Sequence, residues 1–305
     1  MDSSSAIRYH VLHKTRYEYA YPVSLSRQLL HLTPRECDWQ SVVEHEIVAA
    51  PAPTSMHTRL DYFGNTLRQF TLETPHQELL VQAESVVDLV PRAAGRELEA
   101  SPRWEDVAAA LAYGAEPVLL EATACLWESP YTRIKRPLGE YAKACFPPST
   151  PVLVGAQALM KRIFTEFKYD PKATTVGTPL LEAFESRRGV CQDFAHVMIS
   201  CLRSLGLSAR YVSGYLLTQP PPGKPRMIGA DASHAWVSVY CPRDDGDGTW
   251  VDFDPTNNVL PDTQHITLAW GRDFGDVTPL RGVILGGDTQ APEVAVTVTP
   301  VDQEA

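Results

Sequence analysis

The spacing of apolar residues changes along this chain, and that change constrains the fold more than any other feature. From Tyr9 to Tyr19, strand-forming residues occupy every second position, the pattern of a strand with one buried face. From 152 to 167, apolar residues recur at helical spacing, which predicts an amphipathic helix of about four turns. Strands, then helices, then further antiparallel strands are typical of the α+β class.

These patterns divide the 305 residues into four segments, more than one typical compact domain needs. We expect a small β-sandwich in 1–90, a helical connector in 91–150, a second domain in 151–290, and a strand with a polar tail in 291–305. The first segment includes a hairpin whose strands flank Gly64-Asn65, a dipeptide suited to a tight two-residue turn. Its predicted strands cover 9–19, 41–48, 56–63, 66–72 and 78–89.

Charge restricts the classes of partner. The chain has 27 basic and 37 acidic side chains and a formal net charge of −10. Without a long Lys/Arg tract, such a chain is a poor ligand for nucleic acids and anionic membranes. No run of 18 apolar residues occurs, so no membrane-spanning helix is predicted. The first ten residues show neither a basic cluster nor an apolar stretch, so we expect a cytoplasmic protein.

The cysteines give no sign of a disulfide framework or of a metal site. They are scattered and none forms a C-x-x-C pair, so we expect neither disulfides nor structural zinc. The acidic segment 244–248 lacks the spacing of an EF-hand and is expected to be a solvated hairpin loop. We therefore predict no metal and no cofactor. The six cysteines are Cys37, Cys125, Cys145, Cys191, Cys201 and Cys241.

Cys191 stands at the start of a predicted helix, 191–205, just after Gly189-Val190. Unpaired N–H groups and the positive end of the helix dipole favour a thiolate at such a position. The same N–H groups can stabilise an oxyanion. A cysteine at a helix start is more often a packing residue, however, so this position alone does not establish a nucleophile.

A second group of reactive side chains lies on two predicted strands, 233–240 and 249–254. In one simple antiparallel register, His234 lies opposite Asp254 and Trp236 opposite Asp252. Opposed residues bring their Cβ atoms within about 5 Å. A carboxylate there can hold one imidazole nitrogen and leave the other for a thiol. The pattern does not distinguish Asp252 from Asp254, since both share a face with His234.

Three motifs, GVCQDFAH, SHAW and DPTNN, occur in the order and spacing that resemble the bacterial transglutaminase-like family of the papain-like superfamily. The match spans about residues 178–258, and the N-terminal β region resembles the extra domain of bacterial members. The resemblance implies a papain-like transglutaminase core, with helices packed on an antiparallel sheet. It also implies that Cys191 is the nucleophile, that His234 is the base, and that Asp254 orients the imidazole.

Such a triad would perform acyl transfer on an amide bond of a peptide or protein substrate. Water would resolve the thioester in a peptidase or amidase, and an amine in a transglutaminase. The sequence does not distinguish these outcomes. We favour hydrolysis, because water is always present and no lysine-binding feature is visible.

Three residues are expected to contact the substrate: Gln192, Tyr215 and Trp236. Gln192 replaces the tryptophan that follows the nucleophile in the animal enzymes, so substrate choice is not carried over from them. The proline-rich segment 219–230 is a candidate border of the cleft. Two alternatives stay open: a binding module that keeps the fold without catalysis, and a metal site with Cys191, His234 and Asp254 as ligands. The oligomeric state is not indicated.

Overall fold

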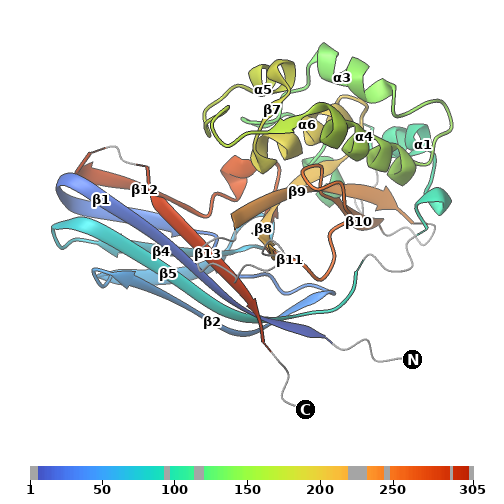
Figure 1. Ribbon diagram of the computed structural model, residues 1–305. Helices are drawn as coiled ribbons and strands as arrows, with labels where there is room; N and C mark the ends of the chain where they lie inside the picture. Colours follow the sequence, from blue (N-terminus) through green and yellow to red (C-terminus); the bar gives the residue numbers. More distant parts are fainter. Residues whose placement is uncertain are drawn as a thin grey trace, which may run out of the picture.

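The computed structural model describes residues 6–92, 97–112, 120–218, 232–243, 248–288 and 291–301. Figure 1 shows a four-stranded sheet between a group of helices and a longer, strongly curved sheet. Within the described residues, no helix has the length and apolarity needed to cross a membrane. The candidate catalytic residues belong to the helical side and to the four-stranded sheet.

The curved sheet has seven strands and is organised around the long strand β1 (Ile7–Leu30). The first half of β1 pairs with β5 and β13, and the second half with β4 and β12. The expected N-terminal β-sandwich therefore takes the form of one continuous sheet. The expected boundary at residue 290 falls between two strands that both pair with β1. The other strands are β2 (Gln40–Ala50), β3 (Ser55–Leu60), β4 (Thr66–Leu72), β5 (His76–Leu89), β12 (Leu280–Gly286) and β13 (Glu293–Pro300).

The prediction of a two-residue turn at Gly64-Asn65 is wrong. Leu60 pairs with Thr66, so five residues connect β3 to β4. Asp61 Oδ1 accepts hydrogen bonds from the N–H groups of Phe63 (2.9 Å) and Asn65 (2.8 Å). The side chain of Asn65 is buried and donates to the Trp270 carbonyl at 2.8 Å. This contact with the other sheet, which local sequence does not reveal, favours the longer loop.

The predicted helices at 152–167 and 191–205 are confirmed as α4 and α6, and α1, α2 and α3 lie in the expected helical connector. Helix α6 packs against β8 and β9 of the four-stranded sheet, whose order is β10-β9-β8-β11. Strand β11 was not predicted. The helices are α1 (Trp104–Ala110), α2 (Leu120–Ala124), α3 (Arg136–Lys143), α4 (Val152–Glu166), α5 (Leu180–Ser186) and α6 (Cys191–Arg203). The strands of this sheet are β8 (Ala209–Leu216), β9 (Ala232–Pro242), β10 (Gly248–Phe253) and β11 (His265–Gly271).

One hydrophobic core joins the two halves of the molecule. It contains side chains of α4, α6 and the four-stranded sheet together with Tyr9, Val87 and Val298 of the curved sheet. A second, smaller cluster lies within the curved sheet around Val23 and Phe70. The curved sheet is therefore packed on the catalytic half through shared apolar surface, which fixes its position beside the site.

Candidate active site

The start of α6 is held by a carboxylate and requires a glycine. Asp193 Oδ2 accepts hydrogen bonds from the Val190 N–H at 2.8 Å and from the Thr174 hydroxyl at 2.6 Å. A Cβ atom at Gly189 would lie 2.4 Å from the same oxygen, so a larger residue would displace the carboxylate. Cys191 is the first residue of α6, where the N–H groups of the first turn have no partners within the helix.

Cys191 differs from most of the other cysteines in its exposure. It is partly exposed, whereas Cys125, Cys145, Cys201 and Cys241 are buried, and none of the six, all in the described residues, is paired. Burial raises the pKa of Cys125 and of Cys241 to about 11. These two thiols are therefore protonated and unreactive at neutral pH.

The predicted register between β9 and β10 is wrong by two residues. Phe253 pairs with Val237 and Asp252 with Ser238, so Asp254 does not lie directly opposite His234. Strand β10 ends at Phe253, and Asp254 begins a turn in which its carbonyl accepts a hydrogen bond from Asn258 N at 2.9 Å. This turn brings the carboxylate to the imidazole, and His234 Nε2 lies 2.8 Å from Asp254 Oδ2.

The Asp254 carboxylate is fully buried and surrounded by donors. Oδ1 accepts from the N–H groups of Thr256 (2.9 Å) and Asn257 (3.2 Å). Oδ2 accepts from the Asn257 side chain at 2.7 Å and lies 3.2 Å from His265 Nε2, besides its contact with His234. So many hydrogen bonds fix the carboxylate in one position and stabilise its charged form.

His234 and Asp254 stabilise each other's charged form. Burial lowers the pKa of His234, but hydrogen bonds to Asp254 and Cys191, with the charges of both groups, outweigh it and raise that pKa to about 10. Burial raises the pKa of Asp254, but hydrogen bonds from His234 and His265 and their charges outweigh it and lower that pKa below its usual value. Both shifts favour a protonated His234 paired with a charged Asp254. Because Nε2 faces Asp254, Nδ1 is the nitrogen left for sulfur.

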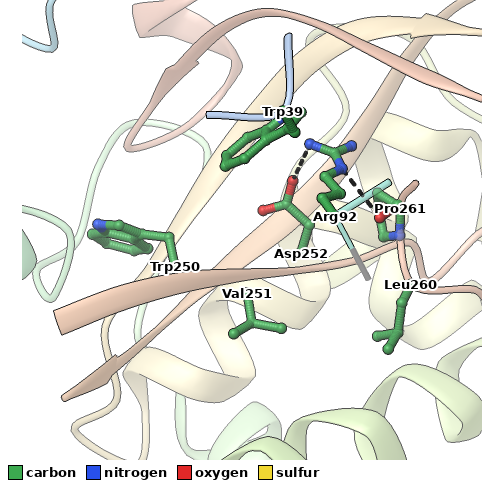
Figure 2. A pocket seen from close by; sticks show the side chains of 7 residues that line it. All are labelled: Trp39, Arg92, Trp250, Val251, Asp252, Leu260 and Pro261. Atoms are coloured by element: carbon green, nitrogen blue, oxygen red, sulfur yellow. Dashed lines mark hydrogen bonds and ion pairs between the residues drawn. The ribbon is translucent and has the colours of Figure 1, made fainter. Parts of the chain in front are cut away.

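Asp252, the other carboxylate that the sequence allowed, has different partners. Trp236 Nε1 donates to Asp252 Oδ2 at 2.9 Å, and Arg92 forms an ion pair with the same oxygen at 3.1 Å. Figure 2 shows Arg92 reaching Asp252 on one side and the Pro261 carbonyl on the other, with the Trp39 ring close by. Asp252 therefore supports the packing of Trp236 and does not contact His234.

His265 is the residue of the site that sequence reasoning missed. It lies on β11, is buried, and meets the Trp236 ring edge-on with centroids 5.3 Å apart. Its Nδ1 atom has no hydrogen-bond partner among the described residues. No motif marks this histidine.

Of the three expected substrate contacts, one remains open to substrate. Trp236 is fully buried, and Tyr215 is buried with its hydroxyl 2.9 Å from His13 Nδ1. Because other side chains cover them, neither presents a surface to substrate. Gln192, the second residue of α6, is partly exposed. The segments 219–230 and 244–248 fall outside the described residues, except for Gly248, the first residue of β10.

Two family models match this sequence. The bacterial transglutaminase-like N-terminal region matches residues 9–88, and the transglutaminase-like superfamily matches residues 140–255. The uncharacterized protein Rv2569c of Mycobacterium tuberculosis (strain H37Rv) is 40% identical over 303 residues, covering 99% of this chain and 96% of the relative. The chain belongs to the transglutaminase-like superfamily. Within it, the uncharacterized protein ML0607 of Mycobacterium leprae is 32% identical over 298 residues, 96% of this chain and 98% of that relative.

The fold of this transglutaminase-like protein agrees with that of a solved structure. A proposed cysteine protease from Cytophaga hutchinsonii matches with a TM-score of 0.74 over 99% of this chain and 93% of that chain, at 18% identity. The expected α+β fold, a papain-like transglutaminase core preceded by a β domain, is thereby confirmed. The protein-glutamine gamma-glutamyltransferase of Pseudomonas aeruginosa is 32% identical over 114 residues, which is 35% of this chain and 16% of that relative.

One group of side chains in this transglutaminase-like protein has the composition of a metal site. Ligand atoms of His234, Asp254 and His265 lie within 4.8 Å of one another. Both imidazoles, however, already meet the Asp254 carboxylate at hydrogen-bond distance, 2.8 and 3.2 Å. The two imidazoles and the carboxylate therefore hydrogen-bond one another.

Proposed function

We propose that this protein is a cysteine-nucleophile enzyme that acts on amide bonds of peptides or proteins, with Cys191, His234 and Asp254 as its catalytic residues. The observation that carries the proposal is the 2.8 Å contact between His234 Nε2 and Asp254 Oδ2, made by a histidine whose pKa both Asp254 and Cys191 raise. A thiol, an imidazole and a buried carboxylate in this order are the parts that nucleophilic acyl transfer requires.

In the first half-reaction, the thiolate of Cys191, whose proton His234 holds, attacks the carbonyl carbon of the substrate amide. The carbonyl oxygen takes the negative charge, and N–H groups of the first turn of α6 stabilise it. His234 donates its proton to the leaving nitrogen as the C–N bond breaks, and Asp254 holds the ring in place. The products are a thioester on Cys191 and a free amine or ammonia.

The second half-reaction determines the class of enzyme. We propose hydrolysis: His234 takes a proton from water, the water oxygen attacks the thioester carbon, and the sulfur leaves. Amine transfer is the second candidate, favoured by the partial similarity to the Pseudomonas aeruginosa gamma-glutamyltransferase. Incubation with casein and a fluorescent primary amine separates the two outcomes. Incorporation of the amine supports transfer, whereas ammonia or new peptide ends without incorporation support hydrolysis.

The triad is tested by measuring the alkylation rate of Cys191 with iodoacetamide across pH by mass spectrometry. An imidazolium beside the sulfur should keep Cys191 reactive at pH values at which ordinary thiols, with a pKa of about 8.5, are protonated. His234→Ala should abolish this reactivity at low pH, and the five other cysteines provide an internal control. If Cys191 reacts no faster than they do and the substitution changes nothing, a non-catalytic binding module replaces this proposal.

Three further points complete the proposal. We propose that Gln192 contacts the substrate, so Gln192→Ala should raise KM more than it lowers kcat. We also propose that catalysis needs no metal, and stoichiometric zinc in the purified protein would replace the triad by a metal site. The cytoplasmic location expected from the sequence stays a proposal, which cell fractionation tests.

A further inference from the structure

A groove of ≈ 580 Å³ lies between the curved sheet and the catalytic half of the molecule. This volume falls within the range of about 300–1,000 Å³ that is usual for ligand sites. One wall comes from β1 and β13, and the other from residues of the catalytic half. The lining residues are His13, Thr15, Tyr17, Val176, Ser233, Phe274, Thr278, Pro279, Leu280, Pro292, Val294 and Val296.

The catalytic wall of the groove borders the triad. Ser233 directly precedes His234 on β9. The Phe274 ring lies against that of Tyr211, with centroids 6.4 Å apart. The Tyr211 ring in turn lies against that of His196, with centroids 5.1 Å apart, and His196 belongs to α6, the helix that Cys191 begins. The groove therefore adjoins the strand and the helix that carry His234 and Cys191.

Another residue of this wall, Val176, also lies close in the chain to a contact with the start of α6. Val176 belongs to the loop whose Thr174 hydroxyl donates to Asp193, two residues after Cys191. A chain lying in the groove would thus pass the first turn of α6.

The described lining carries no charge at neutral pH. Its one histidine among the described residues, His13, is buried between the hydroxyls of Tyr215 and Thr15, each 2.9 Å from a ring nitrogen. Burial lowers the pKa of His13 to about 4, so the ring is neutral. Two apolar side chains, Val176 and Val294, remain about half exposed in the groove (52% and 51%). Such a surface gains free energy when an apolar group covers it.

We infer that this groove binds an uncharged, apolar segment of the peptide substrate beside the amide that Cys191 attacks. The inference rests on the proposed function and adds the substrate class to it. Charged peptide segments are disfavoured, because no described side chain of the groove carries an opposite charge to offset the loss of water. The N-terminal sheet accordingly selects substrate, with β13 supplying Val294.

The test uses two kinds of reagent that alkylate Cys191. Iodoacetamide reports the reactivity of the thiol alone, and peptidyl chloromethyl ketones ending in Val-Phe or in Val-Asp report what the groove accepts. We expect the Val-Phe reagent to react about tenfold or more faster than the Val-Asp reagent, in line with the discrimination that apolar pockets provide. Equal rates for the two peptides would overturn the inference even if iodoacetamide confirms the triad. A Cys191 inert to iodoacetamide would instead overturn the proposed function.

Substitutions at two exposed valines of the same sheet supply the matched control. Val294 lines the groove, and Val283 on β12 is 73% exposed and does not line it. Val294→Glu should slow the reaction of Cys191 with the Val-Phe reagent about tenfold and leave its reaction with iodoacetamide unchanged. Val283→Glu should change neither rate. Val294→Lys should raise the rate of the Val-Asp reagent, a gain that loss of structure does not produce. If the Val294 and Val283 variants behave alike, the groove does not bind substrate.

Discussion

The Nε2 atom of His265 lies 3.2 Å from the same Asp254 oxygen that His234 contacts. A second imidazole therefore holds the carboxylate from the β11 side, and we expect His265 to be a positioning residue. His265→Leu should lower kcat/KM about 10- to 100-fold, because a hydrogen bond to a buried charge contributes about 1.5–3 kcal/mol. His265→Gln, whose amide can donate from a similar position, should restore most of the rate. The rate of Cys191 alkylation across pH is measured in both variants. If His265→Leu and His265→Gln lose the same reactivity, His265 has only a packing role.

Substitutions of the two aspartates should affect different properties. Asp254 should matter for activity, and Asp252 for stability. Asp254→Asn should lower kcat/KM by about three to four orders of magnitude, since the imidazole loses its charged partner. Asp252→Asn should keep the low-pH reactivity of Cys191 but reduce the free energy of unfolding by about 3–5 kcal/mol, because it leaves buried Arg92 without its carboxylate. Urea unfolding and alkylation rates provide the two readouts. Loss of reactivity in Asp252→Asn at full stability would contradict this division.

Gly189→Ala should reduce the reactivity of Cys191 without touching the triad. Its Cβ would collide with the Asp193 carboxylate that holds the start of α6. Gly177→Ala is the control, because nothing lies within 4 Å of a Cβ built there. Alkylation of Cys191 at pH 6 should fall about tenfold in the first variant and stay unchanged in the second. Equal rates in both would show that the Asp193 contact is dispensable.

Acid should destabilise the protein through histidines that are buried in neutral form. Burial lowers the pKa of His196 to about 3, and its Nε2 accepts the Phe274 N–H at 3.2 Å. Its folded pKa lies below the unfolded value of about 6.5, so the unfolded chain binds the proton first and stability falls as pH drops below 6.5. At about 1.4 kcal/mol per pKa unit, His196→Gln, which keeps an acceptor, should flatten urea-measured stability between pH 6.5 and 4. An unchanged slope would exclude His196 as a cause.

His234 should change the pH dependence of stability in the direction opposite to that of His196. Its folded pKa of about 10 lies above the unfolded value, so its contribution is complete below pH 6.5 and is lost as the pH rises towards 10. Comparison with His234→Ala over that range isolates this contribution.

Much of the site could be predicted from the sequence, because its three catalytic candidates lie in short motifs with local order. The register between β9 and β10 could not be predicted, because Asp254 reaches His234 through a turn that follows the last residue pair of β10. Strand β11, and His265 with it, gave no signal. Its residues are buried on both faces, so the alternation that marks a half-buried strand is absent.

The fold was least predictable where distant segments meet. The pattern near Val294 indicated a strand, but nothing local shows that β12 and β13 pair with β1. The burial of Tyr215 likewise depends on His13, which lies about two hundred residues earlier in the chain. Such contacts depend on the whole packing and not on local periodicity.

The 24 residues of β1 are synthesised well before the strands β12 and β13 that cover one of its sides. Until they arrive, β1 presents a long row of unpaired N–H and C=O groups to other nascent chains. The curved sheet therefore cannot be completed until residues 280–300 have been synthesised, and chaperones have a specific edge to protect. A stop codon before residue 280 would leave that edge open for good and yield inclusion bodies rather than a truncated enzyme.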